Sequence, residues 1–350
     1  MKIGIIGLSC SGKTTIFNAL TGQSAETSAF SGAKREPNLA EVNVPDERLY
    51  KLSSMYNPKK TTPAKIQYVD IAGSVSSKDE KKQNELDELL NLLRPTDALL
   101  HVVRNFELAG QTPEPQKDFE ALESELILTD LITVEKRLER LEKESKKGKK
   151  PDPEEYELLK KAKDLLDKGI ALRSDKEICN SKKLRGFTFL SAKPTIVVLN
   201  TGDDLEIGAT KLELPSPIGF IEIKGKLEME IMQLDPEDAE IFRNDLGLDE
   251  PATTKLIQKS YELLGLISFF TVGEDEVRAW TITQGTKAQK AAGVIHSDIE
   301  KGFIRAEVVS YNDLINAGSY HNAQKQGKVR LEGKDYIVQD GDIIQFRFNV

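Results

Sequence analysis

The stretch GIIGLSCSGKTTIFNAL, residues 4–20, decides the fold of the first part of the chain. It satisfies the pattern G-x-x-x-x-G-K-[ST] of a phosphate-binding loop, and the matching residues are Gly7, Gly12, Lys13 and Thr14. The apolar run 3–6 predicts a buried strand before the loop, and the apolar spacing over 14–20 predicts a helix after it. A glycine loop between strand and helix gathers backbone N–H groups at a helix N-terminus, where the helix dipole favours anions. A glycine turn without a ligand is the alternative, and the strand–loop–helix context argues against it.

Each residue type in this loop has an expected role. Lys13 would reach the β- and γ-phosphates of a nucleotide, and the Thr14 hydroxyl would bind Mg²⁺. The remaining predicted nucleotide-binding residues of this stretch are Ser9, Cys10, Ser11 and Thr15.

A second element follows at IQYVDIAG, residues 66–73. In phosphate-loop proteins an aspartate at a strand end holds Mg²⁺, which assigns Asp70 and Thr14 to the metal. A glycine three positions later can donate its N–H to the γ-phosphate, so Lys13 and Gly73 are the predicted catalytic residues. Together with the loop, this D-x-x-G sequence indicates a GTPase-like switch.

Two further strands, expected over 97–106 and 194–204, alternate with helical segments. This alternation predicts an α/β fold with a doubly wound, mostly parallel sheet. The second of these strands ends in Asn200-Thr201-Gly202-Asp203. Guanine-specific proteins carry N-K-x-D here, so Asp203 keeps the base-binding carboxylate while Thr201 replaces the lysine. The predicted base-closing loop holds Lys224, Gly225 and Lys226, because Ser191–Lys193 precedes the strand instead of following it.

Residues 111–190 form a predicted helical insert. Apolar positions at Leu131, Val134, Leu138 and Leu141, and again at Leu158, Ala162, Leu165 and Leu172, indicate two amphipathic helices in a hairpin or short coiled coil. The joining segment 143–150 holds five lysines. It is either a solvated turn or an arm that contacts the phosphates of RNA, since lysines without aromatics favour backbone over base contact.

The chain changes character again near residue 270. Strand-like segments at 277–283, 303–309, 328–333, 335–339 and 342–348 surround a helix expected over 287–296, with a turn at 340–342. The predicted domains are therefore 1–110 with 191–269, the insert 111–190, and a small α+β domain at 270–350.

Composition limits the function classes. The net charge of −8 argues against nucleic-acid binding by bulk attraction, so no DNA partner is expected and an RNA contact requires a local patch. No apolar run is long enough to span a membrane, and no membrane partner is expected. The first residues lead straight into a strand, and the two cysteines lack disulfide or metal-site spacing, which together predict a cytoplasmic location.

These motifs carry a resemblance that spans nearly the whole chain. Residues 277–315 and 327–350 closely resemble the TGS domain that ends proteins of the Obg-like ATPase (YchF) family, and 36–52, 69–73 and 100–106 resemble that family's G domain. The resemblance implies a β-grasp-like C-terminal domain and a cytoplasmic, Mg²⁺-dependent NTPase. It also implies a preference for ATP over GTP, an association with the ribosome or its RNA, and a link to translation and stress responses.

The chain departs from the family pattern at several positions, which marks a divergent member. Lys34 stands where the family has its switch threonine, and Ser74 stands where it has a hydrophobic residue. The family's histidine after the third strand is missing, and His101 is expected to be a core or interface residue.

Two functions remain open at this stage. The first is a slow ATPase that acts as a ribosome-associated switch, because such chemistry depends mostly on positioning and charge neutralisation. The second is a nucleotide-gated adaptor that binds the ribosome or RNA and hardly hydrolyses, which Lys34 favours because it offers Mg²⁺ no oxygen. A GTPase is the further alternative, which the retained Asp203 keeps open.

Overall fold

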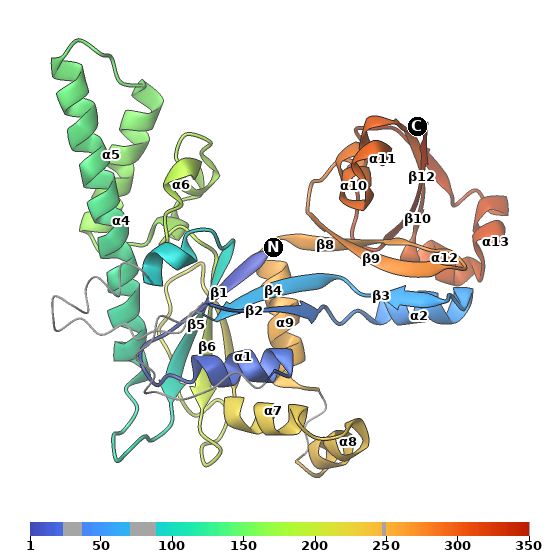
Figure 1. Ribbon diagram of the computed structural model, residues 1–350, viewed down its shortest axis with the longest axis horizontal. Coiled ribbons are helices and arrows are strands. Elements are labelled where there is room, and N and C mark those ends of the chain that lie inside the picture. Colours follow the sequence, from blue (N-terminus) through green and yellow to red (C-terminus); the bar gives the residue numbers. More distant parts are fainter. Residues whose placement is uncertain (24–36, 71–88, 247–249, 350) are drawn as a thin grey trace. The chain divides into compact units, whose positions relative to one another are not determined.

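The computed structural model describes residues 1–23, 37–70, 89–246 and 250–349. The chain divides into two compact units (Figure 1). The first unit consists of Met1–Glu41 and Gln67–Thr253, and the second of Val42–Ile66 and Thr254–Val350.

The first unit is built on a six-stranded sheet of order β2-β4-β1-β5-β6-β7. Its strands are β1 (Lys2–Ile6), β2 (Asn38–Asn43), β4 (Lys65–Asp70), β5 (Ala98–Asn105), β6 (Thr195–Thr201) and β7 (Gly219–Ile223). β1 pairs in parallel with β4 and β5, and β6 pairs in parallel with β5 and β7. The predicted doubly wound α/β fold is confirmed, and β1 lies where the strand order reverses, which is where such sheets bind ligands.

Both faces of this sheet are covered. Every residue of β6 is buried, and all but one in β5, so their side chains pack on both sides of the sheet. One face is covered by α4 (Pro115–Lys146), whose Leu122 and Leu126 pack with Ile6 and Leu99. The other helices of the unit are α1 (Lys13–Thr21), α5 (Pro153–Asp167), α6 (Lys176–Asn180), α7 (Gly225–Met232) and α8 (Pro236–Asp245), with short 3-10 turns η1 (Leu172–Ser174) and η2 (Arg185–Phe187).

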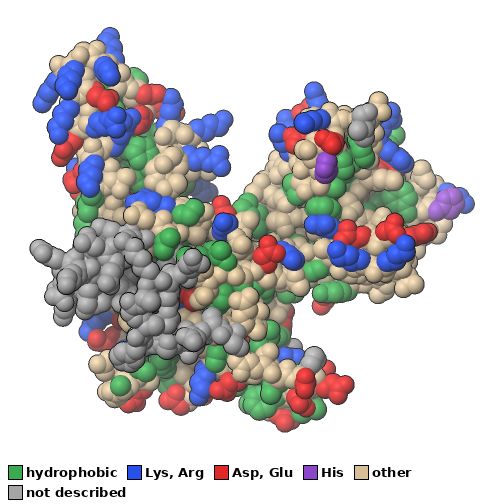
Figure 2. Space-filling model, in the orientation of Figure 1, with side chains coloured by type: hydrophobic (Ala, Val, Ile, Leu, Met, Phe, Trp, Pro, Cys, Tyr) green, Lys and Arg blue, Asp and Glu red, His purple; other side chains and the backbone are tan. Residues whose placement is uncertain are grey.

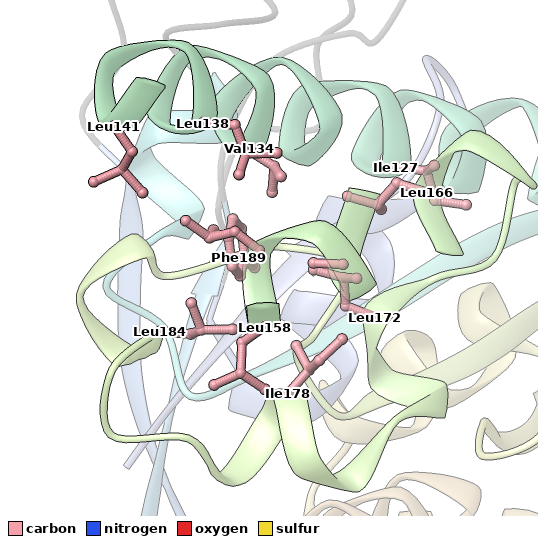
Figure 3. Close-up of a cluster of buried hydrophobic side chains, with 12 residues drawn as sticks. Ile127, Val134, Leu138, Leu141, Leu158, Leu166, Leu172, Ile178, Leu184 and Phe189 are labelled. Atoms are coloured by element: carbon pink, nitrogen blue, oxygen red, sulfur yellow. The ribbon is translucent and has the colours of Figure 1, made fainter. Parts of the chain in front are cut away.

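The second half of α4 pairs with α5 to form the helical arm. Figure 3 shows the apolar cluster between them, with Val134, Leu138 and Leu141 of α4 facing the segment that carries Leu158 and Leu166. Ion pairs flank this core: Arg137 contacts Glu155 at 2.7 Å, and Lys163 contacts Glu135 at 2.6 Å. The predicted hairpin is therefore present. Its second helix ends at Asp167 before Gly169, and Leu172 reaches the same cluster from η1.

Buried polar contacts tie the arm to the segment that precedes β6. The Asp130 carboxylate of α4 accepts hydrogen bonds from the backbone N–H groups of Leu190 (3.0 Å) and Ser191 (2.7 Å). Arg173, in η1, pairs with the buried Glu123 of α4. Since β6 ends at the predicted base-binding residues, the arm and the candidate site share one supporting strand.

The second unit holds a mixed six-stranded sheet of order β11-β10-β12-β8-β9-β3. Its strands are β3 (Lys60–Thr62), β8 (Leu266–Thr271), β9 (Glu276–Thr283), β10 (Phe303–Ser310), β11 (Arg330–Glu332) and β12 (Asp342–Phe348). Its helices are α2 (Glu47–Tyr56), α10 (Ala288–Ile295), α11 (Ser297–Lys301), α12 (Tyr311–Ala317) and α13 (Tyr320–Lys325), and α9 (Ala252–Leu263) enters it from the first unit. Three alanines of α10 join the core formed by Phe269, Val308 and Ile344. The predicted α+β character of this region is confirmed.

Two expectations differ from the structure here. Residues 335–339 form no strand, because their pairing is limited to one bridge between Lys287 and Ile337. The predicted boundaries also assigned residues 42–66 and 254–269 to the first domain, whereas these residues pack in the second unit, where β3 pairs in parallel with β9. A separate third domain for residues 111–190 stays a prediction, because the arm belongs to the first unit.

Over the residues described, none of the helices is both long enough and apolar enough to cross a membrane.

Candidate functional site

The loop between β1 and α1 is shaped by two glycines that admit no side chain. A Cβ on Gly7 would collide with the Val102 carbonyl oxygen, and one on Gly12 would collide with the Asn200 amide. Gly12 also has a positive φ of 89° at the N-cap of α1, and no described side chain caps the helix there. The first N–H groups of α1 have no partner inside the helix, so the loop presents donors at a positive helix end.

The Lys13 ammonium lies folded over the loop. Its Nζ donates to the backbone oxygens of Gly7 at 3.1 Å and Leu8 at 3.0 Å. Burial lowers the pKa of Lys13, while the nearby Asp70 carboxylate acts in the opposite direction. The cation is thus held at the loop by weak neutral partners that a phosphate can replace.

Thr14 and Asp70 meet at the end of the sheet, as the sequence predicts. The Thr14 hydroxyl donates to Asp70 Oδ2 at 3.0 Å, and Asn38 Nδ2 donates to the same oxygen at 3.4 Å. Asp70 is fully buried, and its other oxygen has no partner among the described residues. Burial raises the pKa of Asp70. Asn38 is absent from the predicted site residues, because its place beside Asp70 depends on β2 and β4 being neighbours in the sheet.

Asn200 connects the phosphate loop to the predicted base-closing loop. Its side-chain amide donates to the Ser11 carbonyl oxygen at 3.0 Å and accepts from the Gly225 N–H at 3.1 Å. A Cβ on Gly225 would also come within 2.7 Å of Asn200 Oδ1, so a larger residue there would displace the Asn200 side chain. Three residues predicted from separate motifs are brought together.

Thr201 is buried between neighbouring strands. Its buried hydroxyl donates to Glu222 at 2.6 Å and accepts from Asn105 at 3.1 Å. The Glu222 carboxylate also accepts from the Gly208 N–H at 2.7 Å. Thr201 therefore closes a network among β5, β6 and β7, which a residue-by-residue comparison with N-K-x-D does not reveal.

Asp203 and the two predicted lysines lie together at the surface. Lys224 Nζ donates to the Asp203 backbone oxygen at 2.9 Å, and Lys226 Nζ lies 3.9 Å from the Asp203 carboxylate. These contacts form a charged edge where the sequence places the base.

The remaining predicted residues of the loop differ in their exposure. Ser9 and Cys10 are exposed at the loop tip, where Cys10 has a φ of 60°, and Thr15 is half-buried in the first turn of α1. Ser11 is buried, and its hydroxyl has no partner among the described residues. Gly73, Lys34 and Ser74 lie outside the described residues, so their places in the site remain predictions.

His101 lies in the core, as expected. It is buried in β5 and stacks on Phe119 with ring centroids 5.4 Å apart. Burial, with the charges of Arg173 and Lys13, lowers its pKa to about 3. His101 is therefore neutral at physiological pH.

Known proteins match this chain along its whole length. A protein from Bacillus subtilis (strain 168), named Ribosome-binding ATPase YchF, is 42% identical over 100% of both chains. The chain belongs to the YchF family. A protein of the same name from Haemophilus ducreyi is 40% identical over 100% of this chain and 99% of its own length.

Family models and a solved structure agree with this membership. Residues 266–349 match the C-terminal model of the YchF GTPases, described as "Protein of unknown function (DUF933)". Residues 2–150 match the model described as "50S ribosome-binding GTPase". The solved structure of the Schizosaccharomyces pombe YchF GTPase covers 99% of this chain and 97% of its own, at 30% identity and a TM-score of 0.83. The predicted family and fold class are confirmed.

Proposed function

We propose that the chain binds ATP with Mg²⁺ on the loop between β1 and α1 and hydrolyses it slowly, as a ribosome-associated cytoplasmic switch in translation and stress responses. The observation that carries this proposal is the hydrogen bond from Thr14 to Asp70, 3.0 Å long, beside the Lys13 ammonium at the positive end of α1. This combination serves a nucleotide triphosphate and its metal better than it serves a simple anion.

The donor set suits Mg²⁺. A hydroxyl and a carboxylate are hard oxygen ligands, and Mg²⁺ commonly takes only one or two protein oxygens beside phosphates and water. The partnerless, buried oxygen of Asp70 is a further acceptor at the same place. Thr14 and Asp70 would hold the ion, which when bound supplies charge neutralisation between the phosphates.

The chain's own groups would act by positioning. The backbone N–H groups of the loop would bind the phosphate oxygens, and Lys13 would exchange its two carbonyl contacts for the β- and γ-phosphates. Gly73 would donate its N–H to the γ-phosphate. Together, these groups would stabilise charge on the transferred phosphoryl group without a dedicated base.

Two features support ATP over GTP. Thr201 replaces the lysine of guanine-specific proteins, and its hydroxyl is already used by Glu222 and Asn105. The relatives from Bacillus subtilis and Haemophilus ducreyi are named ATPases, whereas the Schizosaccharomyces pombe structure carries the name GTPase. Asp203 is the feature that keeps GTP as a second ligand.

The ribosome is the proposed partner, and its RNA the proposed contact of the arm. The names of the relatives support the first part. The second part is supported by Lys146, Lys147, Lys149 and Lys150, which are exposed at the tip and form no ion pair with a described residue. Figure 2 shows basic side chains gathered over the end of the arm.

The alternative function is an adaptor that binds nucleotide and the ribosome without hydrolysis. It is favoured by Lys34, which stands where the family has a switch threonine.

Single-turnover phosphate release from ATP, with and without ribosomes, separates the two functions. We expect slow release that Lys13→Ala lowers about tenfold or more, because one charged donor is lost from the phosphates. Lys117→Ala, at an exposed lysine of α4, should leave release unchanged. No detectable release by the unaltered chain under either condition would replace the ATPase by the adaptor.

A further inference from the structure

Helix α8 buries a small side chain and exposes its large apolar ones. Of its described side chains only Ala239 is buried, and Arg243 lies half-buried one turn further on. Ile241 and Phe242 are 60% and 43% exposed. A surface helix normally turns its large apolar residues to the core, so α8 presents the reverse arrangement.

Neighbouring residues extend this exposed surface. Leu246, directly after α8, is 47% exposed. Met232, the last residue of α7, is 45% exposed, and Leu234, between α7 and α8, is 42% exposed. We call these five residues, Met232, Leu234, Ile241, Phe242 and Leu246, the α8 face. Single exposed apolar residues are ordinary, but five large ones within one helix and its flanks indicate an interaction site.

The charged residues of segment 235–245 are mostly acidic. Its acidic residues are Asp235, Glu237, Asp238, Glu240 and Asp245, all exposed and none in an ion pair with a described residue. Arg243 is the one basic residue in 235–245, so this segment carries a net charge of −4. Figure 2 shows hydrophobic and acidic side chains side by side over α8, at the lower edge of the view.

The negative charge of segment 235–245 indicates which class of partner can bind the α8 face. RNA and anionic lipid surfaces would be repelled, because the acidic residues surround the apolar anchors. A symmetric contact between two copies would place the same acidic segments against each other. We propose that the α8 face docks a basic amphipathic segment of a partner protein, with apolar side chains on Ile241 and Phe242 and lysines or arginines against the acidic rim.

The α8 face also lies close in sequence to the candidate nucleotide site. The preceding α7 begins at Gly225, which is bonded to Asn200, and α7 packs along α1 through Met229 and Asn18. A partner on the α8 face would therefore also contact Met232, the last residue of α7. The docking proposal itself does not depend on nucleotide binding or hydrolysis.

The test uses the full chain, without nucleotide, and a labelled peptide of leucine and lysine with its leucines at helical spacing. We expect binding that the double variant Ile241→Ser/Phe242→Ser weakens about tenfold or more, the order expected for loss of two anchor residues. The double variant keeps every charge, and its changed side chains are exposed, so its thermal unfolding should match that of the unaltered chain. Leu128→Ser/Ile132→Ser, which changes two exposed apolar residues of α4, is the matched control and should leave binding unchanged.

Three results would overturn the proposal. If a peptide of the same composition in scrambled order bound equally well, the helical spacing of the leucines would not matter and binding would depend on charge alone. Equal binding by the unaltered chain and the Ile241→Ser/Phe242→Ser variant would remove the apolar anchors. Self-association of the unaltered chain that this variant abolishes would make a second copy the occupant.

Discussion

At the residue scale, Asn200 organises the candidate site. Its amide bonds both the Ser11 carbonyl and the Gly225 N–H, and it fills the space that side chains at Gly12 and Gly225 would need. Both loops are thus held by one buried side chain before any ligand arrives. This arrangement keeps the phosphate loop in a fixed shape, which lowers the entropic cost of ordering the loop when a ligand binds.

We expect Asn200→Ala to destabilise the chain by about 1–3 kcal/mol, because it leaves two buried backbone groups without partners. The variant should also weaken ATP binding by about tenfold, since the loop is no longer held. Thermal unfolding and nucleotide titration measure the two effects. Asn244→Ala, at an exposed asparagine of α8, should change neither. Full ATP affinity in the Asn200→Ala variant would show that the loop needs no such support.

Much of the residue-level site follows from spacing along the chain. The G-x-x-x-x-G-K-[ST] pattern predicted the helix whose first turn holds Lys13 and Thr14, and the strand that ends at Asp70 brings this carboxylate to Thr14. Their roles toward a ligand stay predictions. The roles of Asn38 and Thr201 could not be predicted in this way. Both depend on which strands are neighbours, and the hydroxyl of Thr201 is used by partners on β5 and β7.

At the element scale, the helical arm joins the sheet to a basic tip. α4 runs without a break from the core residues Phe119 and Leu122 to Lys146, and Asp130 anchors it where the arm leaves the sheet. The tip and the anchoring residue Asp130 therefore lie on the same helix.

We expect replacement of Lys146, Lys147, Lys149 and Lys150 by Gln to weaken ribosome binding and to flatten its dependence on salt, because fewer counterions are released. Nucleotide affinity should stay unchanged, since none of these residues contacts the loop. The matched control replaces four exposed lysines of the second unit by Gln: Lys51, Lys301, Lys325 and Lys334. It makes the same change in net charge. If the ribosome affinity of the tip variant fell with salt as steeply as that of the unaltered chain, the tip would be a solvated turn.

Periodicity predicted the long elements better than the short ones. The apolar spacing over 131–141 and 158–165 is long enough to identify both arm helices. The composition of residues 335–339 predicts a strand. In the structure this segment pairs through a single bridge, and the Tyr336 hydroxyl donates to the Asp342 carboxylate. α8 was not predicted either, because its apolar residues point outward.

At the scale of the whole molecule, the second unit is assembled from two distant parts of the chain. Residues 42–66 supply α2 and β3, and Lys60–Thr62 pair in parallel with Glu276–Arg278. Arg48 of α2 adds an ion pair with Asp340 at 2.7 Å. Contacts separated by more than 200 positions leave no local pattern, so the sequence predicted the C-terminal domain without its N-terminal strand.

The affinities of the chain for ATP and GTP test directly whether the β1–α1 loop is a site for ATP and Mg²⁺. Both are measured by calorimetric titration with Mg²⁺ and again with the ion chelated, for the unaltered chain and for Thr14→Ala. We predict that ATP binds at least as tightly as GTP, and that chelation or loss of the Thr14 hydroxyl weakens ATP binding. A hundredfold preference for GTP, about 2.7 kcal/mol, would rule out an ATPase and make the chain a GTPase.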